Sequence, residues 1–201
     1  MDHTPDQVIA RLRPLLVAVR DALSAGVAVS RSIHVQRGWS PTADRHLDHQ
    51  LVRREAMERL KPWEVDLEEP QAGPLAVRQL ELLDTSTDNL GLPMSGLILH
   101  TPTDLLRIWH SDDGELPAAA TDGLRAFYQQ APTRQTQLSF DVEPLVPVAP
   151  ANRLALLWAD PPGDRPGLVR FDLVRPAGHV GRRVQVDWHV DLRERLGRPA
   201  A

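Results

Sequence analysis

The feature that most constrains the fold is the run Arg183 to Arg193, in which apolar and polar residues alternate strictly. One set of alternate positions is apolar: Val184, Val186, Trp188, Val190 and Leu192. The other set is polar and includes Asp187, His189 and Asp191. A period of two over this length predicts a β-strand with one buried and one solvated face. The chain is therefore expected to contain a sheet.

The preceding run, Leu168 to Arg175, shows the same alternation and predicts a neighbouring strand. Antiparallel pairing across a loop at Pro176 to Arg182 places Phe171 opposite Val186 and gathers the apolar residues of both strands on one face. A slip of one residue would expose Trp188, so the pattern fixes the register to within even shifts.

Helical patterns precede the sheet. Thr4 to Ala25 carries an apolar stripe at helical spacing, and Gly26 is a natural stop. Val27 to Val35 fits a strand nearly as well as a helix. Ala43 to Leu60 predicts a second, strongly charged helix, and Thr121 to Gln130 a third, short one.

These patterns predict an α+β fold, in which two N-terminal helices pack on a mostly antiparallel twisted sheet with one additional short helix. Gly96 to His100 and Leu105 to His110 are expected to form a hairpin within that sheet. Residues 1–62 would be the helical segment and residues 63–201 the sheet region, together forming one compact domain.

Composition narrows the classes of function. The chain has no cysteine, which excludes disulfides, thiolate metal ligands and thiol nucleophiles. The net charge of -4 disfavours a dedicated nucleic-acid binder, which is usually basic. Neither a signal peptide nor an apolar stretch of transmembrane length is visible, so a cytoplasmic location without membrane attachment is expected.

The candidate catalytic residues are His189, with Asp187 and Asp191 on the same predicted strand face, and His110. Neighbouring side chains on that face would be roughly 7 Å apart. A carboxylate next to a histidine suits a general base or a metal site. The alternative is a solvated sheet face that carries cross-strand ion pairs.

His46 and His49 are the candidate metal ligands, because residues three apart on a helix share a face. The pair departs from the His-Glu-x-x-His zinc motif: its spacing is one residue short and the glutamate is missing. A merely exposed helix face is the alternative.

Two loops supply candidate ligand-binding residues. Asp112, Asp113 and Glu115 follow the strand that ends at His110, where clustered carboxylates beside an aromatic residue could line a pocket. His179 lies between two glycines in the second loop. The Asp113-Gly114 pair is first of all a turn signal, which is the alternative for the first loop.

The candidate interface residues are Trp39, an aromatic in a polar turn, and three arginines of the second helix, Arg45, Arg53 and Arg59. If the helix exposed these arginines together, they could contact phosphates. Acidic residues are interleaved with them, which is typical of a salt-bridged surface.

The sequence contains no complete catalytic or cofactor motif, so no cofactor is indicated. The leading hypothesis is a non-enzymatic protein–protein interaction or accessory module of a cytoplasmic complex, acting with a protein partner or as a homo-oligomer. The first alternative is a small-molecule-binding protein or metal-dependent enzyme with a pocket near His189 or the His110–Glu115 loop. The second is a nucleic-acid-associated protein.

Overall fold

The computed structural model describes residues 4–40, 45–64, 79–83, 96–130, 152–162 and 167–197. In chain order the elements are α1 (Pro5–Arg37), α2 (Arg45–Leu60), the 3-10 turn η1 (Lys61–Trp63), β1 (Gln79–Leu83), β2 (Gly96–His100), β3 (Asp104–His110), α3 (Asp122–Tyr128), β4 (Asn152–Ala159), β5 (Arg170–Val180), β6 (Arg183–Asp191) and α4 (Leu192–Leu196). The predicted α+β class, with two N-terminal helices and a short extra helix, is confirmed.

The six strands lie side by side in sequence order, from β1 at one edge to β6 at the other. Neighbouring strands are antiparallel except β3 and β4, which are parallel. Because β3 and β4 run in the same direction, the chain that joins them must cross back to the end of the sheet where β3 begins. Helix α3 lies on this connection. The sheet is therefore mostly antiparallel with one parallel pair at its centre.

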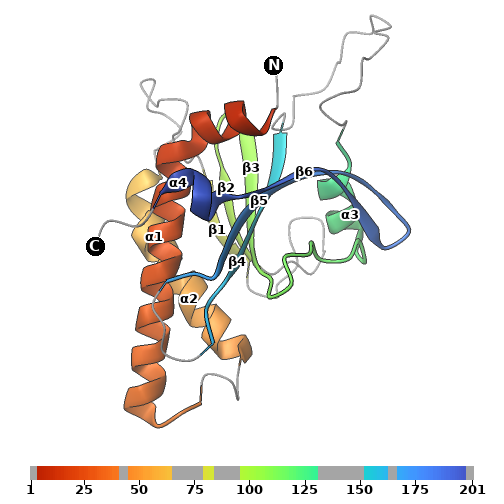
Figure 1. Cartoon of the computed structure of the whole chain (residues 1–201). Helices are drawn as coiled ribbons and strands as arrows, with labels where there is room; N and C mark the ends of the chain where they lie inside the picture. Colours follow the sequence, from red (N-terminus) through yellow and green to blue (C-terminus); the bar gives the residue numbers. More distant parts are fainter. Residues whose placement is uncertain are drawn as a thin grey trace, which may run out of the picture.

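Helices cover the sheet on both faces (Figure 1). On one face α1, α2 and α4 join the strands in a large apolar core that contains Leu16, Leu106, Trp158 and Phe171. On the other face α3 packs Phe127 and Tyr128 against a smaller core. No helix among the described residues is long and apolar enough to cross a membrane.

Helix α1 is longer than expected. It continues through Gly26, where a stop was predicted, and the segment Val27–Val35 is helical rather than extended. The helix ends at Gly38, whose φ of 66° is in the left-handed region, and the Trp39 amide donates to the His34 carbonyl. The sequence-based boundary was wrong because the glycine serves packing rather than termination.

Gly26 is the point of closest approach between α1 and α2. A Cβ atom added there would lie 2.6 Å from the Val52 carbonyl oxygen and 3.1 Å from the Val52 Cγ1 atom. Only a residue without a side chain lets the two backbones come this close. The helix pair therefore depends on glycine at this position.

The β5–β6 hairpin differs from its predicted register. Leu173 pairs with Val190, and β5 continues to Val180, so the expected loop at Pro176–Arg182 is mostly strand. The register shifts around Pro176: Arg175 is opposite Trp188 and Pro176 is opposite Val186, so Asp187 is an extra residue of β6 in this ladder. Such an irregularity changes which alternate residues of β6 face each side of the sheet on the two sides of the shift. The strictly alternating sequence pattern does not reveal this change.

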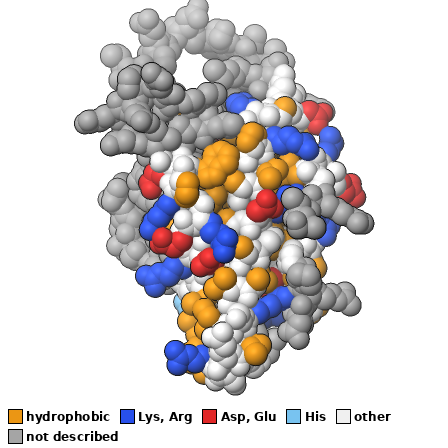
Figure 2. All heavy atoms as spheres, turned by 90° about the vertical axis from the view of Figure 1, so that its left-hand side faces the viewer, with side chains coloured by type: hydrophobic (Ala, Val, Ile, Leu, Met, Phe, Trp, Pro, Cys, Tyr) orange, Lys and Arg blue, Asp and Glu red, His pale blue; other side chains and the backbone are white. Residues whose placement is uncertain are grey.

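Figure 2 shows the side of the molecule that carries α1 and α2. Acidic and basic side chains are interspersed there, with separate groups of hydrophobic side chains between them. This face does not present a field of one sign.

Candidate functional site

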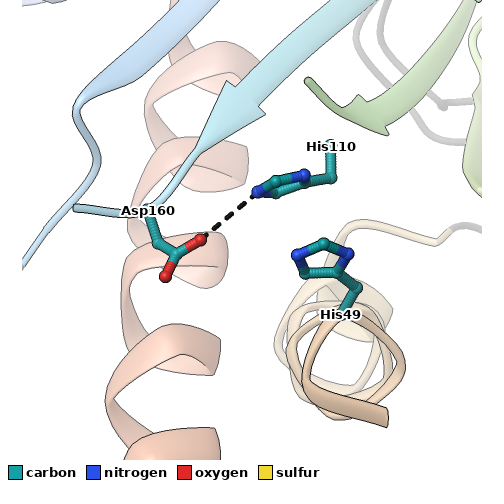
Figure 3. A group of neighbouring side chains, drawn as sticks. All are labelled: His49, His110 and Asp160. Atoms are coloured by element: carbon teal, nitrogen blue, oxygen red, sulfur yellow. Dashed lines mark hydrogen bonds and ion pairs between the residues drawn. The ribbon is translucent and has the colours of Figure 1, made fainter. Parts of the chain in front are cut away.

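The carboxyl ends of the parallel pair β3 and β4 bring together side chains from three elements (Figure 3). His110 is the last residue of β3, Asp160 follows the end of β4, and His49 lies on α2. One potential ligand atom from each of the three residues lies within 4.8 Å of the other two. Ligand sites in sheets with parallel strands commonly form outside the carboxyl ends of those strands.

The three side chains contact one another closely. The Nε2 atom of His110 lies 3.3 Å from the Oδ1 atom of Asp160. The rings of His49 and His110 stack, with centroids 3.7 Å apart and planes 26° apart. The Trp158 ring meets both imidazoles edge-on, at 5.9 Å from His49 and 4.8 Å from His110. The buried indole therefore forms one wall of the cluster.

The cluster holds His49 neutral. Burial, followed by repulsion from His110, lowers the pKa of His49 to about 4. Asp160 is held as a carboxylate: burial acts to raise its pKa, but hydrogen bonds from His110, the backbone and Arg31 keep that pKa below its usual value. Neutral imidazole and ionised carboxylate are the protonation states that bind metal ions.

Arg31 of α1 braces the carboxylate. Its Nη2 atom lies 3.3 Å from Oδ2 of Asp160 and donates to the Pro161 carbonyl at 2.7 Å. The guanidinium thus engages one oxygen of Asp160 while the other oxygen faces His110. A partner of this kind orients a metal-binding carboxylate.

Asp112 borders the cluster. Its Oδ1 atom lies 3.7 Å from Nε2 of His110, and its Oδ2 atom accepts from Arg45 at 3.0 Å. The side chain of Asp112 is exposed. It therefore adds negative charge at the solvent side of His110.

His46, the second predicted metal ligand, is exposed on α2 and does not belong to the cluster. Spacing along the helix suggested that it would act with His49. The structure instead pairs His49 with residues from two strand ends, which helical spacing cannot indicate.

The His110–Glu115 segment and His189 line one pocket of about 640 Å³. Asp113 serves the loop itself: it accepts from the Ser111 hydroxyl and the Glu115 amide, at 2.8 and 2.9 Å. The Glu115 amide, followed by Ser111, lowers the pKa of Asp113. The two regions singled out separately in the sequence are thus parts of one concave surface.

His189 is bound to Asp172 rather than to Asp187 or Asp191. Its Nε2 atom lies 3.0 Å from Oδ2 of Asp172, and the same oxygen accepts from Arg170 at 2.9 Å. Asp172 is buried. The histidine, the carboxylate and the arginine form a continuous polar cluster on the sheet face that α3 covers.

The other predicted polar residues of this region have separate partners. Asp187 accepts from the buried Arg175 at 2.7 Å. Asp191 caps α4 by accepting from the Arg193 amide at 2.8 Å, and its bonds to Arg193 lower its pKa. His179 lies on β5, is half-buried, and its Nδ1 atom lies 3.1 Å from the nearby Gly181 carbonyl oxygen. These residues do not converge with His189.

The predicted interface residues are dispersed. Trp39 is 50% exposed. Arg53 is buried and donates to the His49 carbonyl. Arg59 is paired with Glu55 of the same helix. Arg45 is held by Asp112, so the three arginines do not form one exposed patch.

Three residues of the two clusters were not predicted to belong to them: Arg31, Asp160 and Asp172. Asp160 opens an Asp-Pro-Pro-Gly stretch that has the composition of a turn. The available signal was its place directly after a strand that is apolar on both faces, since such strands are central and their ends are where sites form.

No protein-family model matches the chain, and no curated protein or solved structure is significantly similar to it.

Proposed function

We propose that this protein is a metal-dependent enzyme whose divalent ion, of the zinc class, is bound by His49, His110 and Asp160. The observation that carries the proposal is the convergence of these three ligand atoms within 4.8 Å. Zinc sites with a catalytic role usually have three protein ligands and keep one position for water or substrate, whereas structural sites are closed by four. Two imidazoles and one carboxylate form such a set.

The surroundings support this assignment. The depressed pKa of His49 keeps its ring unprotonated at neutral pH, so binding needs no proton release from that residue. Arg31 engages the second oxygen of Asp160 and orients the carboxylate. The Trp158 ring excludes water from one side of the site. Bound at this place, the ion would supply Lewis acidity and an activated water.

Metal binding is tested on chelator-stripped protein by calorimetric titration with Zn²⁺. The wild type and the His46→Ala variant should bind one equivalent. His49→Ala and His110→Ala should lose affinity by more than the roughly 10–100-fold that removal of an outer-sphere partner costs. His46 is the matched control, because it lies on the same helix and is exposed. Wild-type protein without a stoichiometric site, or with one insensitive to His49 and His110, would refute the proposal.

The open coordination position is tested separately with Co²⁺ in place of Zn²⁺. The visible spectrum of the cobalt protein should change when azide is added, because an exchangeable ligand is replaced. A spectrum that azide leaves unchanged would indicate a closed, structural site and would remove the enzymatic part of the proposal.

A second proposal, a protein-interaction module, has one supporting observation. At the C-terminal end of α1, Val35 is 76% exposed and Trp39 is 50% exposed. Large exposed aromatics are common anchors of interfaces. Analytical ultracentrifugation of the wild type and Trp39→Ala tests self-association through this end: a wild-type dimer that the variant loses supports it, and a monomer in both contradicts it.

The nucleic-acid proposal has less support. Among the three arginines on which it depended, Arg53 is buried and the other two are paired with carboxylates. The face that carries α1 and α2 has charges of both signs (Figure 2). A phosphate-binding surface usually gathers basic residues on one face.

A further inference from the structure

The pocket of about 640 Å³ lies between the segment after β3 and the strands β5 and β6. One wall is formed by the loop that includes Ser111 and Glu115, and the other by Val184, Val186 and His189 of β6. Pockets that bind small molecules commonly have volumes of roughly 300–1,000 Å³. The pocket is distinct from the metal cluster, with which it shares only His110.

His189 presents a hydrogen-bond acceptor here. Its Nε2 atom faces the Asp172 carboxylate at 3.0 Å, and a carboxylate can only accept, so Nε2 carries the proton. Nδ1 of the neutral ring then has a free lone pair. Within the described ranges the ring of His189 makes no other side-chain hydrogen bond. Arg170 holds the same carboxylate oxygen, which fixes the acceptor in place.

The walls carry opposite charges. Arg182 and Arg183, at the β5–β6 turn, line the pocket and are exposed, with no ion pair to any residue the structure describes. Glu115 lines the opposite wall, is exposed, and likewise has no ion pair among those residues. Asp113 is also on that wall, but its carboxylate is bonded to the loop. The lining thus offers cations on one side and a carboxylate on the other.

Between the charges the lining is apolar. Val174 is buried beneath the pocket, Val186 is 47% exposed, and Val184 and Leu116 are half-buried. Exposed valine on a strand face beside a cavity offers apolar area to a ligand. A molecule that fits this surface has an apolar body with a charged group of each sign.

We propose that this pocket binds a small zwitterion with an apolar side chain, of the class of a free amino acid or short peptide. Its carboxylate lies toward Arg182 and Arg183, its ammonium group lies toward Glu115, and Nδ1 of His189 accepts a hydrogen bond from it. The proposal is independent of the metal site, since none of the groups that would hold the zwitterion belongs to the metal cluster.

The test uses three probes that share one apolar body: L-leucine, 4-methylpentanoate, which lacks the ammonium group, and 3-methylbutylamine, which lacks the carboxylate. Each is titrated into the ¹⁵N-labelled full chain and followed by amide chemical shifts. Leucine should give saturable shifts centred on Val184, Val186 and His189. The two truncated probes should bind about tenfold more weakly, as expected when a charged hydrogen bond is lost.

Two variants assign the walls. Glu115→Gln should weaken leucine binding and leave 4-methylpentanoate unaffected, whereas Arg183→Gln should weaken both of these probes. Glu194→Gln is the matched control, because Glu194 is exposed on α4 outside the pocket. No saturable shift with leucine, shifts centred elsewhere, or equal affinity for leucine and 4-methylpentanoate would each overturn the proposal.

The role of His189 has its own readout. In the wild type, ¹H–¹⁵N spectra of the imidazole should show the tautomer protonated at Nε2, and leucine should shift the Nδ1 resonance. Asp172→Asn removes the obligate acceptor, so the other tautomer should appear and leucine affinity should fall. A wild-type ring protonated at Nδ1 would overturn the assigned hydrogen bond, because that atom could not accept.

Discussion

The imidazole rings of His49 and His110 stack at 3.7 Å between their centroids, although one belongs to α2 and the other to the end of β3. Two imidazoles can share this space without large repulsion only when at least one is neutral. The Asp160 carboxylate places a negative charge on the other side of His110, and Arg31 pairs with the second oxygen of that carboxylate. Burial and this contact together disfavour the charged form of His49, and the resulting change in its pKa can be measured in solution.

In the metal-free protein, His49 should titrate at about pH 4, because burial and then repulsion from His110 disfavour its charged form. Its pKa is lower in the folded than in the unfolded chain, so between about pH 6.5 and 4 the unfolded state binds more protons. Stability from this residue is complete above that range and is lost as the pH falls through it. NMR titration of the ring proton measures the midpoint.

His110→Asn should raise the titration midpoint of His49, because it removes the repulsion from His110, which is one of the two main causes of the lowered pKa. His46→Ala should leave the midpoint unchanged and serves as the control. A wild-type midpoint near the ordinary value of about 6.5 would mean that the ring is solvated in solution, contrary to the structure.

The fold class followed from local patterns, because each helix and strand has its own periodicity. The hairpin of β2 and β3 and the central strand β4 were predictable from apolar runs between turn residues. The register of β5 and β6 was not, since the irregularity near Pro176 depends on how the strands fit across the sheet. The extent of α1 was also missed, because the sequence alone does not distinguish a glycine that ends a helix from one that lets two helices pack closely.

The metal cluster could be predicted only in fragments. His49 and His110 were both candidates in the sequence, but for different reasons and in different sites. Their convergence with Asp160 requires the parallel pairing of β3 and β4, and no residue pattern indicates which strands are parallel neighbours. The pocket could not be predicted for a similar reason. His189 and the His110–Glu115 loop lie together because of the order of the strands in the sheet, and the spacing of residues along the sequence does not indicate that order.

Gly26→Ala should destabilise the protein although alanine is the better helix former. The added methyl group would meet the Val52 carbonyl oxygen at 2.6 Å, and a backbone atom cannot move aside cheaply. An overpacking cost of about 1–3 kcal/mol is set against a helix-propensity gain of about 1 kcal/mol, so a net loss of up to about 2 kcal/mol is expected. Urea unfolding measures it. Ser32→Ala, on the exposed side of α1, should change stability by less than about 0.5 kcal/mol; equal effects of the two substitutions would contradict the close helix contact.

Arg175→Met should be among the most destabilising single substitutions. Arg175 is 3% exposed and donates to Asp187 at 2.7 Å and to Asn152 at 3.0 Å. Removal of one partner from a buried pair leaves an uncompensated charge and costs about 3–5 kcal/mol. Arg195→Ala, which removes an exposed pair with Asp6, should cost no more than about 1 kcal/mol.

The double variant Arg175→Met with Asp187→Leu tests whether the stability lost in Arg175→Met comes from the charge left on Asp187. Because it removes both charges, it should recover much of the stability lost in Arg175→Met. Thermal or urea unfolding of the four species completes the cycle. A double variant less stable than Arg175→Met would show that the cost comes from lost packing around the arginine and not from the charge left on Asp187.

Gly114→Ala should disturb the polar cluster at His189 from a distance. Gly114 has a φ of 79°, and a Cβ atom there would lie 2.2 Å from Nη1 of Arg170, the atom that donates to Asp172. Two costs are combined: the left-handed backbone, about 1–2 kcal/mol for a residue with a side chain, and displacement of the guanidinium.

Gly167→Ala separates these two costs, since Gly167 has a φ of 87° and open space around its Cβ position. Gly114→Ala should therefore cost more than Gly167→Ala, and the difference should disappear when Arg170 is replaced by alanine. Equal costs in the wild-type background, measured by urea unfolding, would mean that Arg170 does not rest on this glycine, and the support of Asp172 and His189 by Arg170 would have to be abandoned.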